Sequence, residues 1–167
     1  MDQRFRKNSL RLAEYEYNTP GGYFITISVE NMLQLFGKVH VHECNLNKAG
    51  LMIEQVLTDT VSNFPSIEII VYTVMPNHVH MLLHLLDAAE TRVKNKRSII
   101  SEFVQTFKSK STVEYIRGIK ILDWHKFNKR LWKRGYYDHI IRNDKDYQHI
   151  IMYIFNNPQA KWLKIEK

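Results

Sequence analysis

The sequence predicts an α+β fold of the ferredoxin-like kind, with a mostly antiparallel central sheet and helices packed on it. Apolar, β-branched stretches alternate with longer segments of helical periodicity, in the order β–(β)–α–β–α–β–α. No internal repeat, low-complexity tract or linker interrupts the 167 residues, so we expect residues 1–167 to form a single domain. An antiparallel or mixed sheet with helices on one face fits this order best.

The first half of the chain predicts strands on either side of one helix. Pro20-Gly21-Gly22 is a turn before a strand over residues 23–29, and residues 35–42 form a short extended return. Asn45 can cap a helix that continues to about residue 62, because apolar residues recur there at helical spacing. The apolar residues 67–86 then predict a buried strand region.

The second half predicts another helix, a last strand and a final helix. Residues 98–116 carry an apolar stripe at helical spacing, whereas residues 118–134 predict an irregular segment. Residues 136–142 predict the last strand. Asn143 or Asp144 then caps a helix that ends before Pro158, since a residue that precedes proline avoids the α conformation.

Composition excludes several classes of protein. No run of residues is long and apolar enough to span a membrane, and the start of the chain lacks an apolar signal region, so we expect a cytoplasmic protein. Cys44 is the only cysteine, which excludes a disulfide framework and a cysteine-type zinc site. The glycines never fall at the spacing of a phosphate-binding loop, so ATP-dependent chemistry is not indicated.

Positive charge is concentrated in one segment. Between Lys94 and Arg134, twelve Lys and Arg face three acids, a balance of +9 in a chain whose net charge is +7. Such a segment predicts a nucleic-acid contact, with the interleaved aromatic rings stacking on bases; the alternative is a solvated charged surface above core aromatics. The residues that we expect to contact DNA are Lys108, Lys110, Arg117, Trp132, Arg134 and Arg142.

The segment His78-Val79-His80 carries the clearest chemical signal. Side chains alternate along a strand, so both imidazoles are expected on one face and Val79 on the other. Two imidazoles on one face make half of a divalent-metal site, although two ordinary surface or core histidines would look the same. The second pair of this kind, His40 and His42, lies in a shorter and less apolar segment, which favours surface histidines.

The final helix has two separable stripes. Tyr147, Ile150, Ile151 and Ile154 fall on one side and are expected to face the core. Tyr153 and Asn157 are four residues apart on another stripe, which places a phenol beside a carboxamide. A phenol can act as a nucleophile and a carboxamide oxygen can bind a hard cation. The alternative is a boundary tyrosine with its hydroxyl in water and an Asn that ends the helix.

These features together resemble the HUH single-strand nucleases, in which a His–hydrophobic–His strand is followed far downstream by a tyrosine on a helix. The wider match is to the REP-associated tyrosine transposases, within the single-tyrosine HUH superfamily, and covers roughly residues 20–160. The stretches that carry it are GYFITI (22–27), LFG (35–37), VMPNHVH (74–80), FKS (107–109), LWKRGYYDHIIR (131–142) and YIFNNP (153–158).

The resemblance implies a role for each matched residue. His78 and His80 would bind a divalent metal, Mg²⁺ or Mn²⁺, with Asn157 as the third ligand. Tyr153 would attack a phosphodiester of hairpin-bearing single-stranded DNA and form a 5′-phosphotyrosine. The function implied is thus metal-dependent cleavage and rejoining of DNA in transposition. A homodimer is an option that the sequence leaves open.

Two other functions remain open on the sequence. A non-catalytic nucleic-acid-binding module derived from such a transposase would carry the same basic segment, with incidental histidines. A zinc hydrolase is disfavoured because no third His or carboxylate motif and no HExxH helix accompany His78 and His80. Tyr136 and Tyr137 are other candidate nucleophiles, but only one can face a given site, and we expect them to pack or to stack on DNA.

Overall fold

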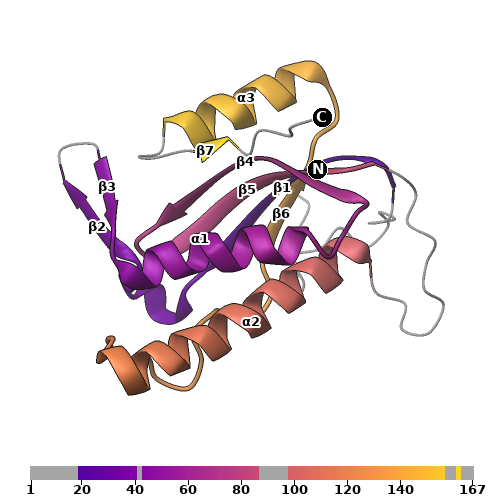
Figure 1. Ribbon diagram of the computed structural model, residues 1–167. Coiled ribbons are helices and arrows are strands. Elements are labelled where there is room, and N and C mark those ends of the chain that lie inside the picture. Colours follow the sequence, from indigo (N-terminus) through magenta and orange to yellow (C-terminus); the bar gives the residue numbers. More distant parts are fainter. Residues whose placement is uncertain (1–18, 41–42, 87–97, 157–160, 163–167) are drawn as a thin grey trace, which may run out of the picture.

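A central antiparallel sheet organises the protein (Figure 1). The computed structural model describes residues 19–40, 43–86, 98–156 and 161–162. Within this part of the chain, five strands pair in the order β6-β1-β5-β4-β7, and every pairing is antiparallel, which confirms the predicted sheet. In that order the strands are Tyr137–Ile140, Gly21–Ser28, His78–Leu85, Ile67–Met75 and Lys161–Trp162.

Two helices, α1 (Lys48–Val61) and α2 (Ile99–Leu122), lie on one side of this sheet (Figure 1). They cover side chains that alternate along the strands, such as Ile25 and Ile27 of β1 and Met81 of β5, all fully buried. Phe103 and Phe107 of α2 belong to the same cluster, as the predicted apolar stripe requires. This face holds the main hydrophobic core.

The third helix, α3 (Asp144–Phe155), lies on the opposite face of the sheet (Figure 1). Ile154 of α3 is buried against Phe24, Val71 and Leu82, and this second cluster also contains the predicted partners Tyr147, Ile150 and Ile151. Helices therefore cover both faces, and the expectation of helices on one face was wrong for α3. Burial on both faces explains why β4 and β5 are apolar along nearly their whole length.

The predicted strand region 67–86 is two strands joined by a tight turn at Pro76 and Asn77. The backbone of residues 29–36 holds this turn, since Val29 donates to the carbonyl of Asn77 and Leu35 and Phe36 donate to that of Pro76. His78 is consequently the first residue of β5, where the chain emerges from the turn.

The remaining elements differ from the sequence expectations in their ends. Asn47, not Asn45, caps α1, because a hairpin of β2 (Gly37–His40) and β3 (Glu43–Leu46) precedes it; a short 3-10 helix, η1 (Glu30–Met32), follows β1. Helix α2 continues past residue 116 to Leu122. Gly118 lets the Trp124 ring pack directly on this last part of the helix, because a Cβ there would come within 2.1 Å of the ring. Among the described helices, none has the length and apolar character that a membrane crossing demands.

Candidate active site

His78 and His80 lie side by side on the face of the sheet that α3 covers. Their ring centroids are 4.4 Å apart, and the intervening Val79 is fully buried in the core on the other side. The predicted alternation along the strand is confirmed. His78 is half-buried, whereas only 6% of His80 is exposed.

Neighbouring side chains fix both imidazole rings. Nδ1 of His80 lies 2.7 Å from the hydroxyl of Thr26, its direct partner on β1. Nδ1 of His78 lies 2.6 Å from Oδ1 of Asn77, whose amide nitrogen points to the carbonyl of Met32. An amide oxygen only accepts hydrogen bonds, so Nδ1 of His78 carries the proton and Nε2 keeps its lone pair.

Burial keeps both imidazoles neutral. It lowers the pKa of His80 to about 3, with a smaller contribution from His78, and it also lowers the pKa of His78. A neutral imidazole offers a nitrogen lone pair, whereas a protonated one offers none. The two rings are thus in the protonation state that metal binding requires.

Tyr153 of α3 reaches the same place from the helix above. Its ring centroid is 5.4 Å from that of His80 and 5.8 Å from that of Phe24, which in turn stacks on His80 at 5.3 Å. The core stripe of α3 faces the sheet as predicted, so Tyr153 lies at the border of the helix with 51% of its surface exposed. His80 and Tyr153 are 73 positions apart in the sequence, yet they form one polar cluster at the edge of the hydrophobic contact between α3 and the sheet.

The arrangement fits two ligands of a divalent cation. Among the described residues, no group of three or more His, Cys, Asp or Glu is placed to hold a metal ion, so no third donor of these kinds accompanies His78 and His80 there. The third expected ligand, Asn157, lies outside the described residues. A cation bound by nitrogen from His78 and His80 would be next to the phenol of Tyr153.

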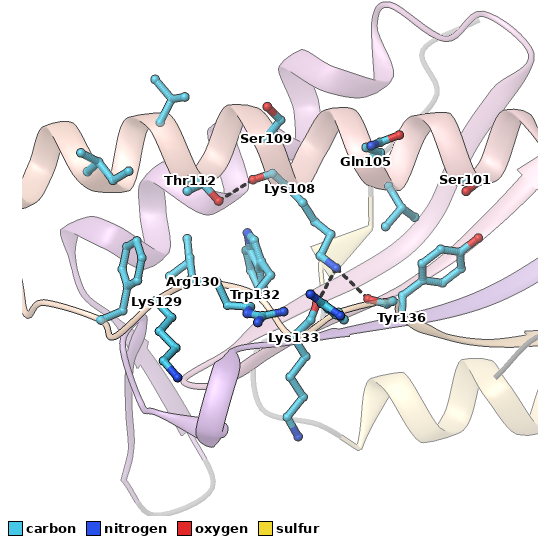
Figure 2. A pocket seen from close by; sticks show the side chains of 17 residues that line it. Ser101, Gln105, Lys108, Ser109, Thr112, Lys129, Arg130, Trp132, Lys133 and Tyr136 are labelled. Carbon is cyan, nitrogen blue, oxygen red and sulfur yellow. Dashed lines mark hydrogen bonds between the residues drawn. The ribbon is translucent and has the colours of Figure 1, made fainter. Parts of the chain in front are cut away.

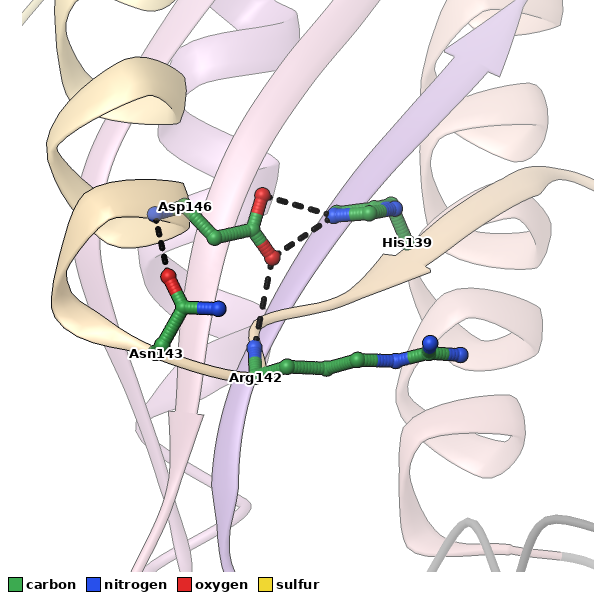
Figure 3. Close-up of polar contacts among 4 residues, drawn as sticks. All are labelled: His139, Arg142, Asn143 and Asp146. Carbon is green, nitrogen blue, oxygen red and sulfur yellow. Dashed lines mark hydrogen bonds and ion pairs between the residues drawn. The ribbon is translucent and has the colours of Figure 1, made fainter.

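Polar contacts fix the start of α3 against β6 (Figure 3). Asn143 caps the helix by accepting from the backbone of Asp146, at 2.9 Å. The Asp146 carboxylate accepts from Nε2 of His139, at 2.9 Å, and from the backbone of Arg142, at 3.2 Å. Partial desolvation raises the pKa of Asp146, but the contacts with His139 and Arg142 outweigh it and leave a net lowering. The helix that carries Tyr153 is thereby attached to the strand next to β1.

A basic pocket of about 720 Å³ lies between α2 and residues 127–136 (Figure 2). No acid lines it, and its cations are Lys108, Lys129, Arg130, Lys133 and Arg134. Lys108 is half-buried, and its ammonium donates to the carbonyls of Lys133 and Gly135, at 2.7 and 2.6 Å. Lys108 therefore holds the 133–135 segment in place, while Lys133 and Arg134 are exposed.

The sheet separates several of the residues expected to contact DNA from the two histidines and Tyr153. Helix α2, with Lys108, Lys110 and Arg117, packs on the face opposite His78, His80 and Tyr153. Lys110, Arg117 and Arg142 are exposed, and Arg117 pairs with Glu114 at 2.9 Å. Trp132 is only 4% exposed and its indole donates to Ser111, at 3.0 Å, which does not fit the base-stacking role expected of it. The aromatic rings of this segment mainly build the core: Phe103, Phe107 and Tyr115 are fully buried.

Sequence reasoning missed the residues that support the histidines, above all Thr26, Phe24 and Asn77. The signal was present in β1, where Phe24, Thr26 and Ser28 alternate with the core residues Tyr23, Ile25 and Ile27. A hydroxyl in the middle of a buried strand indicates a polar partner on the neighbouring strand. Which strand that would be depends on the sheet order, which the sequence left open.

Comparison with known proteins identifies the family of the chain. The family model described as "Transposase IS200 like" matches residues 46–157. A Haemophilus influenzae protein of uncharacterized function is 32% identical over 162 residues, which cover 91% of this chain and 88% of that protein. A second Haemophilus influenzae protein, provisionally named a REP-associated tyrosine transposase, is 22% identical over 149 residues, covering 84% of this chain and 72% of its own.

Solved structures show the same fold. A REP-associated tyrosine transposase bound to a REP hairpin superposes with a TM-score of 0.59 at 22% identity, covering 86% of this chain and 71% of that one. A provisionally named transposase from Deinococcus radiodurans superposes with a TM-score of 0.50 at 18% identity, covering 89% and 97%. The fold and the family match define a transposase-like protein. The chain belongs to the IS200-like transposase family, and its resemblance to REP-associated tyrosine transposases is confirmed.

Proposed function

We propose that this protein cleaves and rejoins single-stranded DNA at hairpin-bearing repeats, through a 5′-phosphotyrosine on Tyr153, in DNA transposition. The observation that carries the proposal is the position of the Tyr153 ring, 5.4 Å from the ring of His80 and on the same face of the sheet as His78. A phenol at the border of a helix, next to two neutral imidazoles, is a suitable nucleophile for a phosphodiester.

The reaction exchanges one ester for another. The Tyr153 phenol gives up its proton as its oxygen bonds to phosphorus, the bond from phosphorus to the 3′ oxygen breaks, and the leaving oxygen takes up a proton to become a 3′-hydroxyl. The phosphotyrosine keeps the energy of the ester, so a 3′-hydroxyl of another strand can reverse the step and join that strand. No nucleotide cofactor is needed. Contacts with Phe24 and His80 orient the phenol for the attack.

A divalent cation, Mg²⁺ or Mn²⁺, completes the proposed site. His78 and His80 would hold it through Nε2, with Asn157 as the third protein ligand. Such an ion would supply Lewis-acid chemistry, offsetting negative charge on the phosphate. Thr26 and Asn77 fix the orientation of the two imidazoles, as hydrogen-bonded neighbours of metal ligands generally do.

The proposed partner is a single strand that carries a hairpin. A solved relative in the same fold is bound to a REP hairpin. The exposed Lys133 and Arg134 of the basic pocket are suited to contact phosphates of such a hairpin. A homodimer is compatible with this function but not required by it.

The experiment that tests the proposal is covalent trapping. Wild-type protein is incubated with labelled hairpin DNA and Mg²⁺ or Mn²⁺, then run on a denaturing gel. We expect a heavier species that carries the label on the 3′ side of the nick, and a released fragment with a free 3′-hydroxyl. Tyr153→Phe should fold and bind the hairpin but form no adduct, whereas Tyr136→Phe and Tyr137→Phe should keep it. An adduct in Tyr153→Phe would place the nucleophile elsewhere.

A non-catalytic DNA-binding module is the second candidate. It is favoured by one observation: α2, which forms one wall of the basic pocket, packs on the face of the sheet opposite the histidines, so this surface could bind DNA without the site. A wild type that binds hairpins but forms no adduct with either metal would support this function instead.

A further inference from the structure

The residues paired directly across the sheet at the level of His80 form a row from β4 to β6. The row consists of Thr73, His80, Thr26 and Tyr137, and all four side chains lie on the face that carries α3. We call it the His80 row. The next row along the strands, with Val71, Leu82 and Phe24, is the one that α3 covers.

Exposure changes steadily along the His80 row. Thr73 is fully buried and His80 is 6% exposed, whereas Tyr137 at the other end is 49% exposed. The site is therefore closed towards β4 and open towards β6, which is one of the two edge strands of the sheet in the described part of the chain. A strand of DNA that places a phosphate at His78 and His80 can therefore pass over the β6 end of the row, where the side chains are exposed.

Tyr137 is connected to the candidate catalytic residues through one ring. Its ring meets the edge of Phe24 at 6.4 Å, and the same Phe24 ring stacks on His80 and contacts Tyr153. Thr26, which holds His80, is the backbone partner of Tyr137. With a strand spacing of about 4.8 Å, Tyr137 lies about 10 Å from His80 across the sheet. This is within reach of a nucleotide that flanks the scissile phosphate.

We propose that Tyr137 is the stacking platform for a base next to the scissile phosphate of single-stranded DNA. The inference rests on the proposed function and adds to it a substrate-positioning residue. Half of the Tyr137 ring is exposed on an edge strand, so the ring is not needed to fill the core, and every base has a face that can stack on it. The ring makes the contact, so the hydroxyl is dispensable.

The test uses 2-aminopurine, whose fluorescence is quenched by stacking. Hairpin-bearing single strands from the DNA that flanks the gene carry the probe at successive positions beside the hairpin, and EDTA prevents cleavage. At saturating protein we expect one flanking position to be quenched by wild type and by Tyr137→Phe, and not by Tyr137→Leu. Leu51→Ala, which shortens an exposed side chain of α1 away from the basic pocket, is the control and should quench like wild type.

Kinetics with Mg²⁺ or Mn²⁺ give a second readout. Tyr137→Leu should lower kcat/KM by roughly tenfold, while Tyr137→Phe keeps the wild-type value and both variants keep the wild-type Tm. Equal quenching by Tyr137→Leu and wild type would overturn the proposal, as would a loss in Tyr137→Phe that equals the loss in Tyr137→Leu. Quenching that depends on the Tyr137 ring, in a protein that forms no adduct, would overturn the proposed function and leave Tyr137 as a base-stacking residue of a DNA-binding module. A wild type that binds no hairpin overturns both.

Discussion

The hydroxyl of Thr26 lies 2.7 Å from Nδ1 of His80, on a directly paired residue of the neighbouring strand. This contact fixes the plane of the imidazole and leaves Nε2 as the nitrogen that can bind a cation. Because β1 and β5 are both central strands of the sheet, the contact belongs to the rigid part of the molecule. It links the order of the strands to the chemistry of the site.

Thr26→Val should weaken metal-dependent cleavage while the protein stays folded. Valine keeps the β-branched shape but has no hydroxyl, so His80 loses its orienting partner. We expect the metal concentration at half-maximal cleavage to rise, or the rate to fall, by roughly 10- to 100-fold. A titration with Mn²⁺ measures it. Thr26→Ser retains the hydroxyl and should recover most of the activity; equal loss in both variants would mean that packing, not the hydroxyl, matters.

Replacing both His78 and His80 by Ala should abolish cleavage and leave hairpin binding nearly intact. The two imidazoles are the metal ligands in the proposed function, whereas the basic pocket is formed by other elements. Cleavage and filter-binding assays on the same DNA separate the two effects. His40→Ala, an exposed histidine of β2, is the control and should cleave normally. Cleavage at the wild-type rate in the double variant would remove the metal site from the proposal.

The sequence predicted the features that depend on local patterning. The same-face placement of His78 and His80 and the core stripe of α3 follow from strand and helix periodicity, and the cap falls at Asn143, one of the two residues expected for it. The position of Tyr153 over the sheet required knowledge of which face α3 covers, and periodicity does not contain this information. The order of the strands is likewise a non-local property, and the pairing of Thr26 with His80 depends on it.

Two other differences have local causes that single-sequence patterns do not show. A register shift between Ile69 and Val71 turns Val71 towards α3, so an unbroken alternation along β4 would place it on the wrong face. Trp132 lies in a basic stretch, yet its indole packs between Phe36 and Phe107, with centroids at 5.3 and 5.6 Å. Charge on neighbouring residues indicates a surface segment, but it does not reveal which way one ring points.

The basic pocket predicts a salt-dependent affinity for DNA. Lys133→Gln with Arg134→Gln should reduce the slope of log affinity against log salt by about 0.7 to 0.9 per lost phosphate contact, and it should do so for many sequences alike. Fluorescence anisotropy over a salt series measures the slope. Lys38→Gln with Lys48→Gln removes the same charge from exposed residues elsewhere and should leave the slope unchanged. An unchanged slope in the first pair would mean that this pocket does not contact phosphates.

Lys108 should matter for stability as well as for binding. Its ammonium donates to the carbonyls of Lys133 and Gly135, so Lys108→Met removes two hydrogen bonds from a charged donor. We expect the free energy of unfolding to fall by about 2 kcal/mol, with faster amide exchange in residues 131–136. Urea denaturation and hydrogen exchange measure both effects. Lys110→Met, an exposed neighbour on α2, should be close to neutral for stability.

Asp146→Asn should loosen α3 and slow the formation of the Tyr153 adduct. The carboxylate accepts from His139 and from the backbone of Arg142, and this contact attaches the start of α3 to β6. Asparagine can still accept one hydrogen bond but has no charge, so we expect faster amide exchange in residues 144–155 at neutral pH. The rate of adduct formation should fall, because the phenol is then held less firmly beside His80.

The pH dependence of this effect has a definite sign. The pKa of Asp146 is lowered in the folded protein from its ordinary 3.8, so its contribution to stability is fully present above that value. The stabilising contribution of Asp146 is lost as the pH falls through its pKa in the folded protein, because the carboxyl is then protonated in both the folded and the unfolded state. The difference in unfolding free energy between wild type and Asp146→Asn should therefore be present at pH values well above 3.8 and shrink as the pH falls below that value. At pH 7, His139→Asn should lower the free energy of unfolding by most of the amount that Asp146→Asn does. A difference that persists unchanged at low pH would show that Asp146 acts by packing and not by its charge.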